Sequence, residues 1–113
     1  MKKYEFRPWG RYITLSEGKD YKVKEITVLP GQQISLQYHN HRKEYWTVVE
    51  GNGYVRINEK IELATPGSNF VIDIKDIHRL SAEESGITII EVQRGEECSE
   101  EDIVRLEDDY SRV

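Results

Sequence analysis

Short apolar, β-branched segments recur along the chain, and turn-forming residues separate nearly every pair of them. Within each segment, residues such as Val, Ile, Tyr and Thr alternate with polar residues, which is the period of a half-buried strand. The separators are SEGKD, LPGQ, EGNG, INEK, TPGS, IKD and EESG. The pattern predicts strands at about residues 11–15, 21–29, 33–39, 44–50, 53–57, 61–65, 69–74, 77–81 and 87–93.

Strands this closely spaced leave no room for the crossover helices of a parallel sheet. The expected fold class is therefore all-β, and a closed antiparallel barrel or jelly roll is favoured. A short C-terminal helix is expected at about residues 100–108, because Ser99 is a suitable N-cap and acidic residues follow it in the first turn. Ile103, Val104 and Leu106 would give that helix an apolar side to pack across the barrel.

The composition narrows the classes of partner. A chain of 113 residues is long enough for one core but not for two, so a single domain over residues 1–113 is expected. The net charge of -5 and the pI near 5.2 argue against a nucleic-acid surface. Cys98 has no second cysteine to pair with, and the sequence MKKYEFRPWG lacks the apolar stretch of a signal peptide. We therefore expect a cytoplasmic protein that binds neither nucleic acid nor membrane.

All three histidines lie in two segments with spaced polar residues. The first segment is Gly31-x5-Gln37-x-His39-x4-Glu44-x6-Gly51, and the second is Gly67-x5-Asp73-x-Lys75-x2-His78. Residues two apart on a strand share a face, so His39 can point into one cavity with Gln37 or with His41. Glu44 has the opposite parity and joins them only if the chain turns or bulges between positions 39 and 44. Imidazoles and a carboxylate brought together in this way predict a divalent-metal site.

These segments resemble the two motifs of the cupins, G-x5-H-x-H-x(3–4)-E-x6-G and G-x5-P-x-G-x2-H-x3-N. With Gln37 in place of the first histidine, the first motif is met without an insertion. The second is met at Gly67 and His78, whereas Asp73, Lys75 and Ala82 replace its Pro, Gly and Asn. The resemblance implies a cupin double-stranded β-helix, a jelly-roll barrel, that binds one divalent ion of zinc, manganese, nickel, cobalt or iron.

Two ligand sets are compatible with the sequence. One is Gln37, His39, Glu44 and His78, which the register of the cupin motif favours. The other replaces Gln37 by His41, which ligand chemistry favours because imidazole is the better ligand for zinc, iron or nickel. His39, Glu44 and His78 are common to both sets.

Much of the chain is similar to a narrower group, the C-terminal cupin domain of type II mannose-6-phosphate isomerases. That domain is usually joined to a mannose-1-phosphate guanylyltransferase, whose Gly-rich nucleotide loop is not found here. Tyr45 stands where the group usually has His, and residues 95–100 also depart from it. The matching stretches are RPWG with Tyr12 at residues 7–12, YKVK at 21–24, SLQYHNHR with Glu44 and Trp46 at 35–46, Val48-Val49, HRL at 78–80, EVQ at 91–93, DIVR at 102–105, and Asp109, Tyr110 and Arg112.

This resemblance implies interconversion of mannose 6-phosphate and fructose 6-phosphate. The reaction moves a proton between C1 and C2 of the open-chain sugar, so it needs a base. His41 is one candidate if it is not a ligand, and Glu91 is the other. Glu91 shares a strand face with Gln93, and that face either lines the cavity or meets solvent.

The phosphate group of such a substrate requires cations. The candidates are Arg42 and Arg79, each next to an expected ligand, Arg105 on the expected helix, and Lys22 and Lys24 on one strand face. Two other functions fit the same motifs: an iron-dependent cupin oxygenase and a non-catalytic sugar-phosphate-binding cupin. A homodimer is expected, because strand-rich cupins commonly cover a sheet edge in that way.

Overall fold

The structure is a computed structural model, and it describes residues 3–112. Within these residues the chain forms nine strands and no helix, so none of this part offers a helix that could cross a membrane. The strands are β1 (Tyr4–Arg7), β2 (Gly10–Glu17), β3 (Tyr21–Val28), β4 (Leu36–Tyr38), β5 (Arg42–Ile57), β6 (Lys60–Ala64), β7 (Asn69–Ile72), β8 (His78–Gly95) and β9 (Val104–Glu107).

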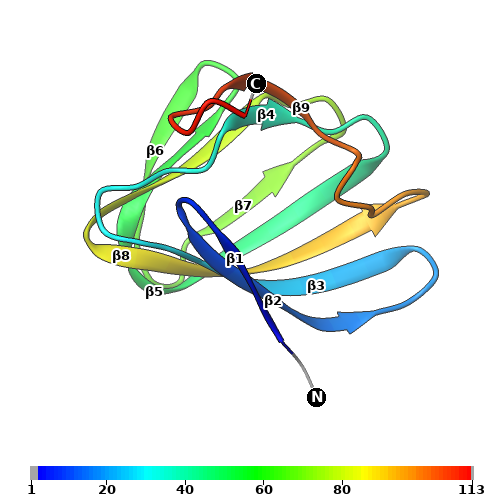
Figure 1. Ribbon diagram of the computed structural model, residues 1–113, viewed down its shortest axis with the longest axis horizontal. Helices are drawn as coiled ribbons and strands as arrows, with labels where there is room; N and C mark the ends of the chain where they lie inside the picture. The colour runs from blue at the N-terminus through cyan, green and yellow to red at the C-terminus, as the bar shows by residue number, and fades with distance from the viewer. Residues whose placement is uncertain (1–2, 113) are drawn as a thin grey trace.

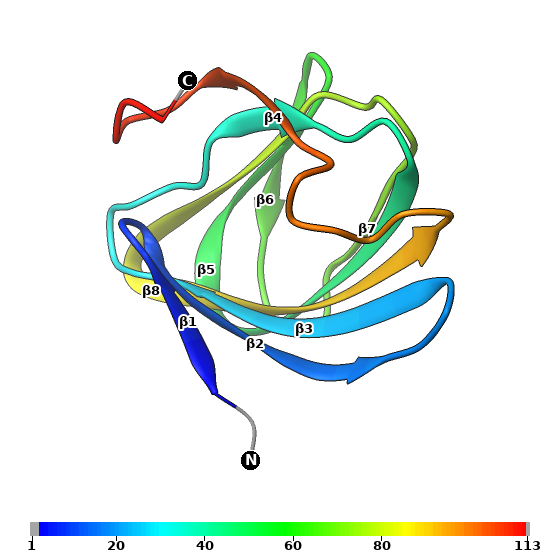
Figure 2. The same cartoon turned by 45° about the vertical axis from the view of Figure 1, so that its right-hand side comes forward.

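The strands form one antiparallel sheet that curls into a two-layered barrel (Figures 1 and 2). In one layer the order is β1-β2-β3-β8-β5-β7, and in the other it is β9-β4-β8-β5-β6. The long strands β5 and β8 pair along most of their length and contribute to both layers. The jelly-roll barrel expected from the sequence is thus confirmed.

Glycines allow β5 and β8 to pass from one layer to the other. The ladder between the two strands shifts register between Val48 and Glu50 and again between Gly51 and Gly53. Gly51 has a φ of 80°, and a Cβ on it would lie 2.0 Å from the carbonyl oxygen of Gly86 on the facing strand. Only glycine combines this backbone conformation with such a close approach. The shift changes whether even- or odd-numbered residues of the strand face inward. Both layers can therefore point apolar residues into one core.

The interior has an apolar part and a polar part. Trp9, Val28, Val48, Leu80 and Ile89 belong to the core between the layers. The polar part is formed by inward-facing residues just after β4, at the beginning of β5 and near both ends of β8. Its buried members are His39, Arg42, Glu44, His78, Glu91 and Gln93.

The prediction of a helix at residues 100–108 is wrong. Ser99 does cap a turn, since its Oγ accepts a hydrogen bond from the backbone N–H of Glu101 at 3.3 Å. The chain then extends as β9, whose Val104 pairs with Tyr38 of β4. Pairing with this open sheet edge satisfies the backbone of β9 and outweighs the local helix signal.

Two further differences concern the strands. β1 was not expected from the pattern, and it pairs with β2 across a turn at Pro8 and Trp9. The strands expected at 44–50 and 53–57 form the single strand β5, and those at 77–81 and 87–93 form β8. Glycine in these segments marks a bend within a strand and not a reversal of the chain.

Candidate metal centre

Three buried side chains from three segments converge at the polar part of the barrel. His39 follows β4, Glu44 lies on β5 and His78 begins β8, and each is at most 2% exposed. His39 Nε2 lies 3.2 Å from Glu44 Oε2, and His78 Nε2 lies 3.7 Å from Glu44 Oε1. The potential ligand atoms of the three residues all lie within 4.8 Å of one another. Ligands bound at about 2.0–2.2 Å to one ion would lie roughly 3–3.6 Å apart, so this geometry is near that of a metal site.

The hydrogen bonds of the two histidines fix which nitrogen faces the centre. His39 Nδ1 lies 2.6 Å from the carbonyl oxygen of Asp102, and His78 Nδ1 lies 2.7 Å from that of Asp76. A carbonyl can only accept, so each Nδ1 carries the proton and each Nε2 presents a lone pair. His78 Nε2 is buried and has no hydrogen-bond partner among the described residues. Lone pairs that converge on a carboxylate without protons between them fit a divalent cation.

Burial keeps both imidazoles neutral. It lowers the pKa of His39 to about 3, with the charge of Arg42 as the second cause, and it lowers the pKa of His78 to about 4. Neutral imidazole is the form that binds a metal, so the fold holds both rings ready for binding at neutral pH.

The structure brings Gln37 to the centre and leaves His41 outside it. Gln37 Nε2 lies 3.3 Å from His39 Nε2, while its Oε1 accepts a hydrogen bond from Ser35 Oγ at 2.6 Å. An amide binds a cation through oxygen, so Gln37 would act as a ligand with its amide group turned over. His41 is exposed, and its ring lies with Glu97 and Asp102 in a separate cluster.

Asp102 shapes the turn that the parity argument required. Its carboxylate accepts the backbone N–H groups of Asn40 at 2.9 Å and His41 at 3.0 Å, and its carbonyl orients His39. This tight turn ends β4 and starts β5, so Glu44 faces the same cavity as His39. Sequence reasoning missed this role, because Asp102 was assigned to the first turn of a helix and no local signal links it to a turn so far away.

Arg42 points into the centre and holds two of the candidate ligands. Its Nε donates to Glu44 Oε2 at 2.9 Å, and its Nη2 lies 3.3 Å from the lone pair of His39 Nε2. Its Nη1 donates to the carbonyl oxygen of Ser99 at 2.9 Å. Arg42 therefore compensates the charge of Glu44 and ties β5 to the segment before β9.

Glu91 faces the cavity next to this set. It is 4% exposed, and it accepts hydrogen bonds from Gln93 Nε2 at 2.7 Å and Trp46 Nε1 at 3.1 Å. Trp46 Nε1 also donates to Glu44 Oε1 at 3.0 Å, so one N–H bridges the two carboxyl groups. Burial, followed by the charge of Glu44, raises the pKa of Glu91 to about 7. The group can therefore take up and release a proton near neutral pH.

The other expected cations are distributed between this cavity and the surface. Lys24 is buried in the cavity wall, where it pairs with Glu100 and lies 4.0 Å from the ring centre of Tyr12. Lys22 Nζ lies 4.0 Å from the same Glu100. Arg105 lines the cavity, but Arg79 does not. Arg79 instead bonds the carbonyl oxygen of Ile34 at 2.9 Å and lies 3.7 Å from Glu107.

Comparison with known proteins places this site in a family. Residues 1–108 match the family model described as mannose-6-phosphate isomerase C-terminal. The chain belongs to this family. The domain is 44% identical over 109 residues to alginate biosynthesis protein AlgA of Pseudomonas aeruginosa, covering 96% of this chain and 23% of that protein. It is 40% identical over 116 residues to mannose-1-phosphate guanylyltransferase ManC of Salmonella typhimurium, covering 100% of this chain and 24% of that protein. The chain thus spans about a quarter of the length of these relatives.

Solved structures show that this mannose-6-phosphate isomerase C-terminal domain has the cupin fold. Oxalate decarboxylase from Bacillus subtilis matches with a TM-score of 0.83 at 16% identity, over 93% of this chain and 30% of that one. An RmlC-like cupin from Shewanella frigidimarina matches with a TM-score of 0.77 at 20% identity, over 83% of this chain and 84% of that one. Another structure of the decarboxylase concerns its Mn(II) centres.

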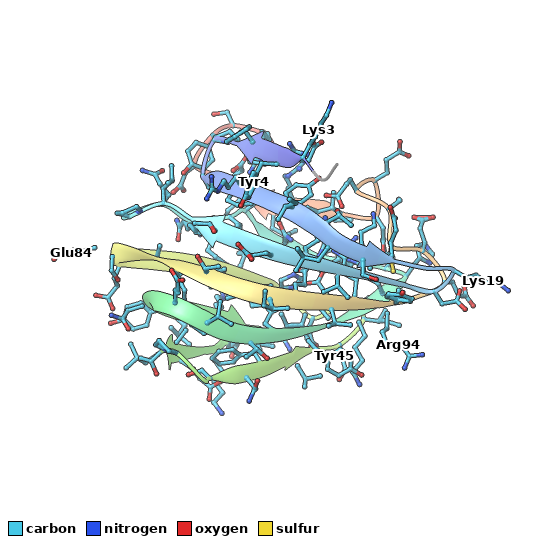
Figure 3. The ribbon with its side chains drawn as sticks, turned by 90° about the horizontal axis from the view of Figure 1, so that it is seen from below. Lys3, Tyr4, Lys19, Tyr45, Glu84 and Arg94 are labelled. Carbon is cyan, nitrogen blue, oxygen red and sulfur yellow. The ribbon has the colours of Figure 1, made fainter. Side chains whose placement is uncertain are left out.

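The departure from the family at Tyr45 lies away from the cavity of this domain. Tyr45 is 38% exposed and points outward from β5, on the surface that also carries Arg94 (Figure 3). The residue type at this position therefore does not alter the inward face of β5, which carries Glu44 and Trp46.

Proposed function

We propose that this domain is a metal-dependent sugar-phosphate isomerase that interconverts mannose 6-phosphate and fructose 6-phosphate. Membership of the family supports the proposal. The observation that carries it is the convergence of two neutral imidazoles and Glu44 beside a second buried carboxyl group, Glu91, whose pKa is about 7. An aldose–ketose isomerisation needs a group that exchanges protons near neutral pH, and a bound cation is one way to stabilise the negative charge that develops on the sugar oxygens.

His39, Glu44 and His78 would hold the divalent ion, with Gln37 as the fourth ligand. Such an ion, of zinc, manganese, nickel, cobalt or iron, would supply a Lewis acid that stabilises negative charge on the carbonyl oxygen of the open-chain sugar. The carbonyl groups of Asp102 and Asp76 keep the two rings oriented for binding.

Glu91 is the proposed base. It would take the proton from C2 of the aldose and return it to C1 while the hydroxyl proton moves from O2 to O1, which gives the ketose. Trp46 and Gln93 hold its two oxygens, so the carboxyl group is positioned before the substrate arrives. His41, the other candidate base, has an exposed ring outside the cavity and is not assigned this role.

A coupled isomerase assay on the chain, with the bound metal measured in parallel, tests the proposal. Glu91→Gln should lower kcat about 100-fold or more while metal content is unchanged, because general-base catalysis typically contributes factors of about 10²–10⁴. Glu84→Gln, at an exposed position in the bend of β8, is the matched control and should leave kcat unchanged. In the unsubstituted chain with its metal, kcat/KM should fall on acidification as Glu91 takes up its proton, at a pH below 7 because a bound cation offsets the charge of Glu44 that helps to raise the pKa of Glu91.

The same measurements separate the other candidate functions. Bound metal and sugar-phosphate binding without turnover would contradict the isomerase and support a non-catalytic binding cupin. Bound iron with oxygen uptake in place of isomerisation would support a cupin oxygenase.

A further inference from the structure

Three arginines from distant segments line the cavity that also borders Gln37, Arg42 and Glu91, next to the candidate metal centre. Arg7 ends β1, Arg105 lies on β9 and Arg112 lies beyond β9. In both ribbon views the turn between β1 and β2 lies on the side of the barrel that carries the segment after β9 (Figures 1 and 2). The fold therefore gathers positive charge at one place, although the sequence separates it.

The register connects this cluster to the metal centre. On β4, Gln37 pairs with His78 of β8 on one side and with Arg105 of β9 on the other. Directly paired residues of neighbouring strands point to the same face of a sheet. Arg105 therefore presents its side chain to the cavity two strands away from His78, with Gln37 between them.

Two of these arginines have no anionic partner within residues 3–112. Arg105 Nε is buried without a hydrogen-bond partner, and no described carboxylate lies within ion-pair distance of either Arg105 or Arg7. Arg7 bonds only neutral oxygens, the carbonyl of Phe6 at 2.9 Å and the hydroxyl of Tyr12 at 3.2 Å. A buried donor without a partner costs free energy, and a ligand that accepts the hydrogen bond removes that cost.

Arg112 completes the cluster and is held in place. Asp108 accepts from its Nε at 2.6 Å and from its Nη2 at 3.1 Å. Burial, followed by the charge of Arg112, lowers the pKa of Arg105; Asp108 opposes this shift and Arg7 adds to it, so the Arg105 guanidinium lies close enough to the other two to be repelled by them. An anion between them would relieve this repulsion.

The other cations of the site already have partners. Arg42 is compensated by Glu44, and Lys24 by Glu100. The cations without a negatively charged partner are therefore Arg7 on β1 and Arg105 on β9, which lie on one wall of the cavity.

We propose that Arg7, Arg105 and Arg112 bind the phosphate group of the substrate, a sugar phosphomonoester. This inference rests on the proposed function and locates the substrate within the cavity. The phosphate of a hexose 6-phosphate is at the opposite end of the carbon chain from C1 and C2. With the phosphate at the arginines, C1 and C2 point past Gln37 towards His39, His78 and Glu91. Guanidinium groups bind a phosphate dianion through paired, charge-assisted hydrogen bonds.

Calorimetric titration with a ligand that cannot be isomerised tests the site. The probe is 1,5-anhydromannitol 6-phosphate, which cannot open its ring, with mannose as the neutral reference and inorganic phosphate as the minimal anion. Arg105→Gln and Arg7→Gln should each weaken binding of the two phosphate probes about 10-fold or more, because charge-assisted hydrogen bonds are the strong ones. Arg105→Lys should lose less, since it keeps the charge and loses the paired geometry.

Arg94→Gln is the matched control, because Arg94 is exposed and points away from the barrel (Figure 3). It removes the same charge and should leave binding of both phosphate probes unchanged. Circular dichroism and thermal unfolding verify that each variant is folded.

Affinities of Arg7→Gln and Arg105→Gln equal to that of the unsubstituted chain would overturn the proposal, and so would an equal loss in Arg94→Gln. Arginine-dependent binding of phosphate in a chain without isomerase activity would contradict the proposed function but leave the phosphate site standing. Turnover that survives both arginine substitutions with an unchanged KM would contradict the phosphate site but leave the proposed function standing.

Discussion

The rings of His39 and His78 lie with their centroids 4.9 Å apart and their planes tilted by 48°. Each ring is held at Nδ1 by a backbone carbonyl and turns its Nε2 to Glu44. This arrangement aims two lone pairs at one carboxylate inside a closed barrel. Arg42 offsets the charge of Glu44, but His78 Nε2 is buried without a hydrogen-bond partner among the described residues. A polar atom is costly to bury unpaired, so a bound cation explains this arrangement better than packing does.

Removal of either imidazole should abolish metal retention. His39→Ala and His78→Ala each delete one ligand and should weaken metal binding about 100-fold or more, since even partners that only orient a ligand contribute 10–100-fold. The barrel should stay folded, because neither histidine belongs to the apolar core. Metal content after dialysis, measured by plasma mass spectrometry, checks the result. Full occupancy in either variant would refute the ligand assignment.

Gln37 and His41 should behave differently in the same measurement. Gln37→Ala should lower metal affinity, because Gln37 lies 3.3 Å from His39 Nε2, whereas His41→Ala should leave it unchanged, because the ring is exposed. The His41 variant is thus the control for the Gln37 variant. An equal loss in both would mean that neither four-residue set is right.

The metal-free domain should lose stability on acidification. The pKa values of His39 and His78 are about 3 and about 4 in the folded chain, below the ordinary 6.5, so the unfolded chain binds more protons between these values and 6.5. Each group then lowers the free energy of unfolding by about 1.4 kcal/mol per pH unit as the pH falls through that window. Glu91, with its raised pKa of about 7 against an ordinary 4.5, opposes this trend between pH 7 and 4.5.

The net loss should therefore be gradual from pH 6.5 to 4.5 and steepest between pH 4.5 and 4, where the opposition from Glu91 has ended and both histidines contribute; below pH 4 only His39 contributes. Urea denaturation in the presence of a chelator measures it. The double variant His39→Gln, His78→Gln is the control and should lose less stability over the same range. A stability that stays constant or rises between pH 6.5 and 4 would contradict the assigned protonation states.

Gly51→Ala should destabilise the fold more than Gly67→Ala. Both glycines have positive φ, 80° and 93°, so alanine is strained at either position. A Cβ at Gly51 would also lie 2.0 Å from the carbonyl oxygen of Gly86, whereas a Cβ at Gly67 would meet nothing within 4 Å. We expect a loss of about 1 kcal/mol at Gly67 and about 3 kcal/mol or more at Gly51, by urea denaturation. Equal losses would show that the close approach of β5 to β8 at Gly51 does not restrict the residue at that position.

Strand parity predicted much of the site. The opposite parities of His39 and Glu44 required a turn between them, and the structure has it at Asn40 and His41. The choice between Gln37 and His41 could not be made from parity, because both are two residues from His39. That choice depends on Asp102, which fixes the turn from a distant part of the chain.

Features that depend on contacts between distant segments were not predictable in the same way. Residues 100–108 carry a helix signal, and only the open edge of β4 makes Val104–Glu107 a strand. Arg7 and Arg112 gave no local sign of facing the cavity next to the candidate centre. The homodimer and the cytoplasmic location stay predictions.

The most direct test of the central claim is anomalous diffraction from crystals of the chain grown with manganese or zinc. We predict one strong peak among His39 Nε2, His78 Nε2 and the carboxylate of Glu44, with the amide of Gln37 beside it. A water-filled space at that point, or a peak only at the cluster of His41, Glu97 and Asp102, would contradict the account.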